Sequence, residues 1–253
     1  MRPGAARDAF FFFVERVRRT RMMANGTMGA VRPECIVRQG EDWMIVHPVP
    51  DFLAGAAAQY SVSQRATLNR IIGLPQVRRE VLGHRIRTDR IAIALVKGEI
   101  AGCLSYRMDG AGSVWPEPWR FRRRFGLLGG TARWLLTEAT LRRGRADELY
   151  IEGFKVDSTA RGRGIGTALL EWLGNEVIRR GKRAWRTEAS LTAQAAIRVY
   201  QSVGARPLRS VSLGPLGPLF DRQGFVVIRW EAPAAGVAPT QPPLPAAFPP
   251  PGR

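Results

Sequence analysis

Three glycines at alternate positions lie between Val156 and Leu170, where an apolar run typical of a strand passes into an apolar pattern typical of a helix. Glycines let the backbone curl so that successive N–H groups point at one spot, and the start of a helix adds its partial positive charge. The turn is therefore predicted to bind an anion, and phosphate or pyrophosphate is the expected ligand.

Two nucleotide-binding turns have similar glycines but a different spacing. A P-loop ends in Gly-Lys-Ser/Thr, whereas Gly166 is followed by Thr167 and Ala168, so no lysine is placed on the phosphates. A dinucleotide turn reads G-x-G-x-x-G, and counting from Gly162 puts Thr167 at the third glycine. Glu188 follows roughly 20 residues later, where such sites carry an acid, so the dinucleotide turn remains an alternative.

The elements that must position this turn follow from hydrophobic periodicity and from helix and turn signals. Lys97-Gly98 is typical of a tight hairpin turn, and Gly153 inside an apolar strand indicates a bulge. Strands are expected at 43–47, 90–96, 99–106, 149–156, 184–189, 208–213 and 225–230. Helices are expected at 52–60, 63–82 with an interruption at Pro75, 125–143, 164–180 and 192–203.

Length and charge suggest one globular domain with tails. Residues 1–40 are predicted to be a basic flexible extension, 41–231 the folded domain, and 232–253 a disordered tail rich in proline and alanine. The 39 Lys and Arg against 21 Asp and Glu give a formal charge of +18, which attracts polyanions. Nucleic acid and a phosphate-bearing coenzyme both fit that charge.

Other residue classes are sparse. The two cysteines, Cys35 and Cys103, are too few for a disulfide framework or a zinc cluster, and they fit a reducing cytoplasm. His47 and His84 are isolated in the sequence, so no metal site is expected. No apolar run reaches the length that spans a bilayer, so no membrane partner is expected either.

The spacing Arg161-x-x-Gly164-x-Gly166 resembles the acyl-coenzyme A pyrophosphate loop, Q/R-x-x-G-x-G/A, of the GNAT superfamily of N-acetyltransferases. The order of expected elements from about 43 to 231 is similar to that of the same family. The resemblance implies an α/β fold of the layered α+β kind. Its mixed, mostly antiparallel sheet would be splayed at the central strands and flanked by helices.

A second motif lies at the expected distance from the first. Residues 193–205 resemble the family pattern N-x-x-A-x-x-L-Y-x-x-x-G-F, which three positions match, namely Ala196, Tyr200 and Gly204. Ala193 replaces the usual asparagine and Ala205 the usual phenylalanine. These departures remove an amide that contacts the coenzyme and an aromatic ring that packs.

The resemblance implies acetyl-coenzyme A as donor and an amine-bearing acceptor, with no metal. Main-chain groups of Phe154, Lys155 and Val156 would pair with the pantetheine arm as an added strand does, and the Val156 N–H would stabilise the developing oxyanion. The pyrophosphate would be held by the backbone N–H groups of Arg161, Gly162, Arg163, Gly164, Ile165, Gly166 and Thr167.

Two side chains are expected to move protons. Tyr200, whose phenol has an ordinary pKa of about 10, would donate to the departing thiolate. Glu152, before the bulge, would accept the amine proton directly or through water if its pKa is raised. Cys103 offers a covalent acetyl-thiol route instead, but no base lies near it in sequence, so a buried cysteine is expected there.

The sequence therefore predicts a cytoplasmic N-acetyltransferase that moves an acetyl group to a primary amine by direct attack. One rival is a non-catalytic acyl-coenzyme A sensor or partner-binding module. Another, less favoured, is a basic nucleic-acid-associated protein with contacts in the extension and in residues 125–143. The positive charge favours an acidic or phosphorylated acceptor over a polycation, whereas nothing in the sequence indicates the oligomeric state or the true start codon.

Overall fold

The computed structural model describes residues 31–63, 65, 68–141, 144–212, 214 and 224–233, which from Pro33 onward belong to one compact unit. The expectations for residues 1–30 and 234–253 lie outside this described part. The strands are β1 (Ile36–Gln39), β2 (Trp43–Val46), β3 (Ile91–Val96), β4 (Glu99–Arg107), β5 (Glu148–Val156), β6 (Ala184–Ser190), β7 (Arg206–Ser212) and β8 (Gly224–Glu231). The α-helices are α2 (Asp51–Ser63), α3 (Asn69–Ile72), α4 (Pro75–Leu82), α5 (Pro118–Phe125), α6 (Leu127–Leu141), α7 (Ile165–Arg179) and α8 (Gln194–Ser202).

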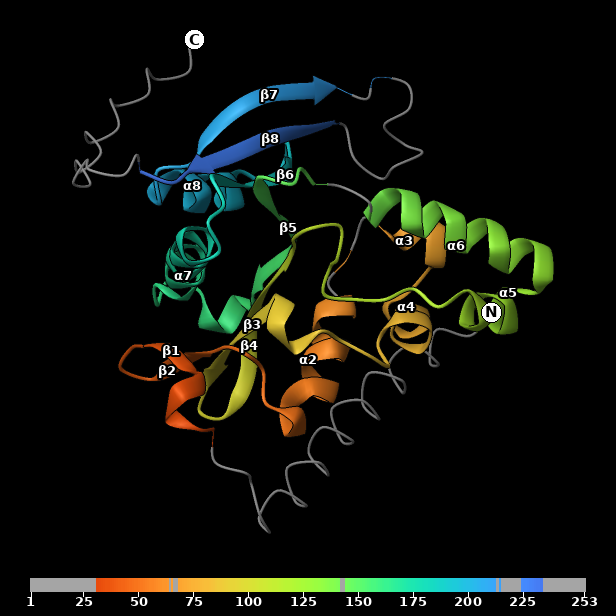
Figure 1. The fold of residues 1–253 in the computed structure, drawn as a ribbon, viewed down its shortest axis with the longest axis horizontal. Coiled ribbons are helices and arrows are strands. Elements are labelled where there is room, and N and C mark those ends of the chain that lie inside the picture. The colour runs from red at the N-terminus through yellow and green to blue at the C-terminus, as the bar shows by residue number, and fades with distance from the viewer. Residues whose placement is uncertain are drawn as a thin grey trace. The chain divides into compact units, whose positions relative to one another are not determined.

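Within the described residues, eight strands form one sheet in the order β1-β2-β3-β4-β5-β6-β8-β7 (Figure 1). Neighbouring strands are antiparallel except β5 and β6, which run parallel because α7 connects them as a crossover. A mixed, mostly antiparallel sheet flanked by helices confirms the expected fold class.

The hairpin of β3 and β4 has the expected turn. Lys97 and Gly98 have φ angles of 51° and 81°, the left-handed values that a two-residue hairpin turn with right-handed twist requires. Val96 and Glu99 are the last pair before the turn. This hairpin forms the middle of the sheet and supplies the neighbour on which β5 is built.

The sheet is splayed between β5 and β6. Their pairing covers only the first residues of each strand and ends at Tyr150 and Arg186, although β5 continues to Val156 and β6 to Ser190. Beyond this point the far edge of β5 has no β6 partner. The expected splay is thus confirmed, and it opens immediately before the bulge.

The bulge itself is in β5. Ser105 pairs with Gly153 and Tyr106 with Ile151, so Glu152 is the extra residue that has no partner on β4. A bulge adds twist and re-aims the side chain of the extra residue. Gly153 therefore predicted the bulge correctly, and the residue inserted into the strand is Glu152, directly before it.

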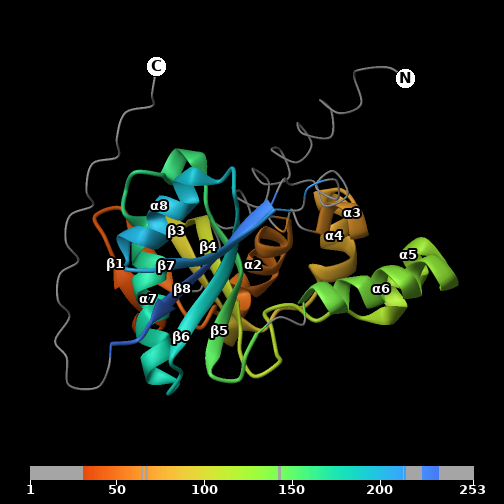
Figure 2. The ribbon, with the colours of Figure 1, turned by 90° about the horizontal axis from the view of Figure 1, so that it is seen from above.

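Helices cover both faces of the sheet. Figures 1 and 2 show the central strands between α7 on one side and α2 on the other. The α7 side holds the larger core, in which Leu169, Leu173 and Val177 pack against buried residues of the sheet such as Leu104 and Trp185. A second core joins the helices of the other side, with Val62 of α2, Leu82 of α4 and Phe121 of α5 among its buried members.

Two expectations need correction. No helix was expected directly before residue 125, but Pro118–Phe125 form α5, which ends at Gly126 because a residue with a φ of 76° cannot continue a right-handed helix. The helix expected at 125–143 is α6. Strand β1 also lies inside the stretch expected to be a flexible extension. It pairs with β2, so the sheet begins before residue 41.

Among the described residues, no helix combines the length and the apolar character needed to cross a bilayer. The outward face of α6 is nevertheless apolar, with Leu128 at 86% and Leu136 at 56% exposure.

Candidate active site

The glycine loop connects β5 to α7 and is open to solvent. Gly162 and Gly164 have φ angles of 78° and 77°, and an added Cβ on either would meet no atom within 4 Å. Residues 161–164 are exposed, and α7 begins at Ile165 without a side-chain cap. The first N–H groups of a helix have no acceptor inside it, so an anion placed at the loop could accept them.

The loop is attached to the sheet by its side chains and by β2. The Arg161 Nε donates to the Val156 carbonyl at 3.2 Å, and the Trp43 Nε1 donates to the Arg163 carbonyl at 3.0 Å. Arg163 also forms an ion pair with Asp42. These contacts hold the turn in place beside the end of β5.

Gly166 has a different role from the two glycines of the turn. A Cβ at Gly166 would lie 3.4 Å from both Phe154 of β5 and Val199 of α8, the lower limit of ordinary contact. The absence of a side chain therefore lets the first turn of α7 approach the strand and the neighbouring helix closely. Gly162 and Gly164 thus shape the turn, and Gly166 lets the start of α7 lie close to β5 and α8.

The far edge of β5 presents main-chain groups to the splay. The Asp157 N–H donates to the Ala101 carbonyl of β4 at 2.8 Å. Because the hydrogen-bonding direction alternates along a strand, Phe154 and Val156 point their N–H and C=O groups away from β4, towards the open side. The main-chain groups of Lys155 point at β4 instead, contrary to the expectation that all three residues line the splay.

Tyr200 projects from α8 to the apex of the splay. Its side chain is 5% exposed, and its ring centroid lies 5.5 Å from that of Phe154 and 5.9 Å from that of Trp185. Its hydroxyl forms a hydrogen bond with Thr187, the first residue of β6 beyond the last pair with β5. Burial raises the pKa of the Tyr200 phenol above its ordinary value, so the group stays protonated at neutral pH.

Glu152 lies on the opposite face of the sheet, in a buried cluster of ion pairs. Its Oε1 accepts from the Arg107 Nε at 2.9 Å, and its Oε2 accepts from the Arg65 Nη2 at 3.1 Å. The backbone N–H and the hydroxyl of Ser113 each donate to Oε2 at 3.0 Å. The side chains of the three charged residues are at most 9% exposed.

This environment reverses the pKa expected for Glu152. Burial alone would raise the pKa of the carboxyl, but the charges of Arg65 and Arg107 and the Ser113 hydrogen bonds outweigh burial, and the pKa is lowered. The raised pKa on which the expected base role depended is therefore wrong. A carboxylate stabilised by four hydrogen bonds has little tendency to take up a proton.

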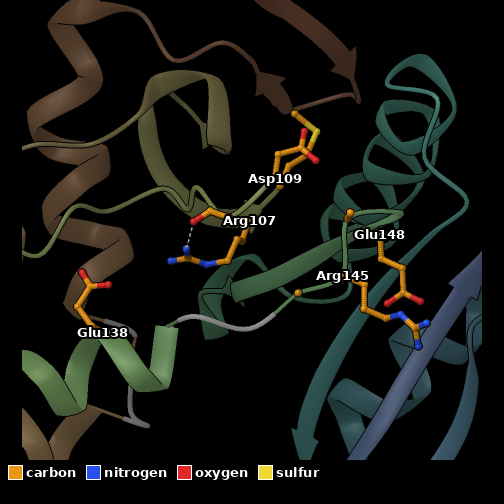
Figure 3. A pocket seen from close by; sticks show the side chains of 9 residues that line it. Arg107, Asp109, Glu138, Arg145 and Glu148 are labelled. Carbon is orange, nitrogen blue, oxygen red and sulfur yellow. Dashed lines mark hydrogen bonds between the residues drawn. The ribbon is translucent and has the colours of Figure 1, made fainter.

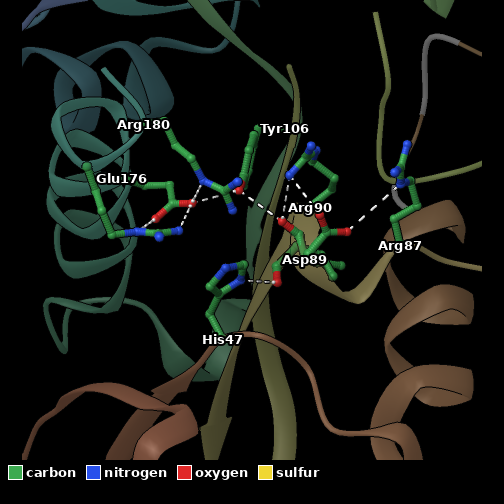
Figure 4. A network of polar contacts seen from close by, with 9 residues as sticks. His47, Arg87, Asp89, Arg90, Tyr106, Glu176 and Arg180 are labelled. Atoms are coloured by element: carbon green, nitrogen blue, oxygen red, sulfur yellow. Dashed lines mark hydrogen bonds and ion pairs between the residues drawn. The ribbon is translucent and has the colours of Figure 1, made fainter. Parts of the chain in front are cut away.

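A polar network on the other face fixes α7 to the sheet (Figure 4). Glu176 of α7 accepts from Arg179, Arg180 and the Tyr106 hydroxyl of β4, the last at 3.1 Å. Burial would raise the pKa of the Glu176 carboxyl, but the two arginines lower it to about 2. His47 lies beside this network, where its Nδ1 is 2.9 Å from the Ile91 carbonyl and burial lowers its pKa.

A pocket of about 550 Å³ opens at the end of β4 and the start of β5 (Figure 3). Arg107 borders this pocket and donates to the Gly110 carbonyl at 2.6 Å, while the same guanidinium holds Glu152. Its other charged lining residues are Asp109, Glu138, Arg145 and Glu148. The buried cluster is thus connected to a surface pocket through one arginine.

The remaining chemical candidates have no part in the site. Cys103 is 2% exposed, and burial raises the pKa of its thiol to about 12, as expected of a buried cysteine rather than a nucleophile. Within the described residues, no group of three or more His, Cys, Asp or Glu side chains is placed to hold a metal ion. His47 and His84 contact different residues, Ile91 and Glu117.

Sequence reasoning missed three members of the site: Arg65, Arg107 and Ser113. They lie 87, 45 and 39 residues before Glu152 in the chain, so no local spacing connects them. One signal was available. A bulge directs the extra residue out of the regular alternation, and a charged residue at that position needs a buried partner.

Residues 74–205 match the model of the acetyltransferase (GNAT) family. That region is more than half of the chain and contains both the glycine loop and Tyr200. The protein belongs to this family of acetyltransferases. No curated protein matches the sequence.

Solved structures with a similar fold share little sequence with the chain. A mutant of agmatine N-acetyltransferase, in its apo form, is 14% identical with a TM-score of 0.49 and covers 76% of this chain and 100% of its own. The ribosomal-protein-S18-alanine N-acetyltransferase of Escherichia coli is 18% identical with a TM-score of 0.43, over 77% and 96%. A Bacillus anthracis protein described as a streptothricin acetyltransferase, in complex with acetyl coenzyme A, is 15% identical with a TM-score of 0.39. The match covers 56% of this chain and 62% of that one.

Proposed function

We propose that this protein transfers an acetyl group from acetyl-coenzyme A to a primary amine by direct attack. The observation that carries the proposal is the meeting of three features at one place. These are an uncapped helix start behind a left-handed glycine turn, an open strand edge, and a protonated tyrosine at the apex of the splay. Membership of the acetyltransferase family supports the same conclusion.

The donor would lie along the loop and β5. Backbone N–H groups from Arg161 to Thr167, the last of them in the first turn of α7, would hold the pyrophosphate. The pantetheine arm would enter the splay and pair with the main chain of Phe154 and Val156, as an added strand does. The thioester would then lie near the bulge, with Tyr200 on one face of the sheet and Glu152 on the other.

The transfer then needs three events at the thioester. The amine attacks the carbonyl carbon, and the Val156 N–H, which points to the open side, stabilises the oxyanion. The C–S bond breaks as the intermediate collapses, and the Tyr200 hydroxyl donates its proton to the departing thiolate. The phenol regains a proton from the solvent when coenzyme A leaves.

The amine must lose a proton before or during attack. We propose that water accepts this proton, because the lowered pKa of Glu152 makes its carboxylate a poor acceptor. Glu152 then acts on the reaction only through Arg65 and Arg107, whose side chains it holds against the sheet. Its role in this proposal is to position the two arginines.

Calorimetric titration with acetyl-coenzyme A tests the donor site. Gly164→Glu puts a carboxylate and a side chain into the proposed pyrophosphate site, so we expect no measurable binding. Gly181→Glu is the matched control: Gly181 follows the other end of α7, also has a positive φ of 65°, and also has no atom within 4 Å of an added Cβ. Both variants carry a similar backbone strain of about 1–2 kcal/mol, yet only the first should lose the ligand.

Two outcomes would contradict the proposal. One is the absence of acetyl-coenzyme A binding by the unaltered protein, and the other is equal binding by the two glycine variants. The sensor alternative is separated by measuring thiol release with an amine panel. Binding without acceptor-dependent release would favour a sensor over an enzyme.

A further inference from the structure

Two of the four buried arginines in the described part of the chain, Arg78 and Arg65, differ in how completely they are paired. Arg78 is 2% exposed and donates to the backbone carbonyls of Val62, Ser63 and Gly73 and to the Asn69 side chain. Each of its three nitrogens therefore has an acceptor. This is the ordinary way to bury a guanidinium, because an unpaired buried donor is costly.

Arg65 is buried to the same degree but is only partly paired. It is 4% exposed, and its Nη2 donates to Ser113 and Glu152. Its Nε and Nη1 have no hydrogen-bond partner within the described part of the chain. Unpaired N–H groups on a buried cation indicate that an acceptor is missing.

Other unpaired polar groups lie on the same side of the sheet. The hydroxyls of Ser61, one turn before Arg65, and of Ser105, on β4, are buried and have no partner within the described residues. The Ser105 Oγ lies 3.0 Å from the position of a Cβ on Gly153, beside the bulge. Arg65, which contacts Glu152, and Ser105, which lies beside Gly153, are thus both next to the bulge, where the proposed function puts the thioester and the amine.

The charges of the cluster do not balance. Arg65 and Arg107 carry two positive charges and Glu152 one negative charge, which leaves a net charge of +1 in a buried place. The next acid along the chain after β5, Asp157, accepts from the Tyr60 hydroxyl and lies 3.7 Å from the Lys155 ammonium, so it already has partners. One further negative charge would neutralise the cluster and accept the free Arg65 donors.

We infer that the acceptor carries a carboxylate, which binds Arg65 while its amine meets the thioester at the bulge. This inference rests on the proposed function and names the class of its substrate: amino acids or peptides that present a free carboxylate close to the reacting amine. A polycation would place its second positive charge beside an unbalanced arginine. Such acceptors are disfavoured by the same cluster.

The unaltered protein tests this with paired acceptors. A series of amino acids with different separations of amine and carboxylate is compared with the carboxamide of each, in steady-state thiol release at fixed acetyl-coenzyme A. At least one acid should exceed its carboxamide in kcat/KM on the order of 100-fold, because a buried cation left unpaired rejects the neutral analogue. Phosphoethanolamine against ethanolamine shows whether a phosphate substitutes for the carboxylate.

Three arginine variants locate the effect. Arg65→Gln should raise the KM for the preferred acid at least tenfold and erase its advantage over the carboxamide, while the affinity for acetyl-coenzyme A stays unchanged. Arg65→Lys should restore part of the advantage because it keeps the charge. Arg78→Gln should lower the stability but leave the ratio of acid to carboxamide unchanged, because Arg78 has all its acceptors within the protein.

The outcomes separate this inference from the function on which it rests. If acetyl-coenzyme A binds and amines are acetylated, but no acid exceeds its carboxamide, the inference is overturned and the proposed function stands. If Arg65→Gln keeps the full preference, Arg65 is not the carboxylate site. If the protein does not bind acetyl-coenzyme A, both the proposed function and this inference are contradicted.

Discussion

The Tyr200 hydroxyl hydrogen-bonds with Thr187 at the point where β5 and β6 separate. Tyr200 belongs to α8 and Thr187 to β6, so one bond fixes the phenol across the opening of the sheet. The ring is wedged between Phe154 and Trp185, which leaves little freedom for any other direction. The Tyr200 phenol is therefore held in the position for proton transfer before the substrate that supplies the acetyl group binds.

Tyr200→Phe should lower kcat about 100- to 1000-fold, because the thiolate would leave without a proton donor. The KM for acetyl-coenzyme A should change little, since the loop and the strand edge are unaffected. Tyr106→Phe is the matched control: Tyr106 is also buried, and its hydroxyl also has partners, Asp89 and Glu176. A Tyr200→Phe enzyme as active as the Tyr106→Phe control would remove Tyr200 from the mechanism.

Glu152→Gln should destabilise the fold by about 3–5 kcal/mol, because it leaves Arg65 and Arg107 buried without their counter-charge. Urea denaturation measures this loss. The rate per folded molecule, assayed at low temperature, should fall less than tenfold if water is the base. A loss of 100-fold or more with normal folding, together with a lost acidic limb in the pH–rate profile, would restore Glu152 as the base.

Cys103 should resist alkylation at pH 8, because burial both shields its sulfur and keeps it as the thiol. Cys35 is only partly buried and should react first. Mass spectrometry after a timed treatment with iodoacetamide distinguishes the two sites. Cys103→Ala should also keep its acetyltransferase activity, and an acetyl adduct on Cys103 would contradict direct attack.

The Glu176 carboxyl should make folding sensitive to acid. Its pKa is about 2 in the folded protein against an ordinary 4.5, so its stabilising contribution is complete above about pH 4.5 and is lost as the pH falls towards 2. The unfolding free energy of Glu176→Gln should therefore be below that of the unaltered protein at pH 6, and the difference should shrink at pH 3.

The control for this measurement is Glu231→Gln, whose side chain is 68% exposed and which should change the free energy little at either pH. A difference for Glu176→Gln that stays constant between pH 6 and pH 3 would mean that the carboxyl is not held by Arg179 and Arg180. Urea denaturation at the two pH values supplies all the free energies needed.

Much of the fold could be predicted because its signals are local. The Lys97-Gly98 turn, the glycine loop and the break before Pro75 each depend on residues within a few positions of one another. The splay was expected from a family resemblance rather than from the residues alone. Strand β1 was not predicted because it is short and mostly exposed, and its sequence has no alternation of apolar and polar residues.

The candidate site was predicted from motifs on one face of the sheet and from a single residue, Glu152, on the other. Tyr200 and the loop lie within motifs, whereas the partners of Glu152 are brought to it by the packing of α2 and β4 against β5. A pKa depends on such partners more than on residue type. The sequence therefore indicated a functional role for Glu152, but not whether its carboxylate accepts a proton or positions two arginines.

The bulge at Glu152 also changes which positions of β5 face the core. Before it, odd-numbered residues such as Leu149 and Ile151 point towards α7, and after it even-numbered ones such as Phe154 and Val156 do. Removing Glu152 would restore a regular strand and leave Phe154 and Val156 facing the core, because Ile151 would then be followed by Gly153 in the outward position. The packing of the sheet therefore does not need the inserted residue, and its deletion should disturb the α7 core little while it leaves Arg65 and Arg107 without their counter-charge.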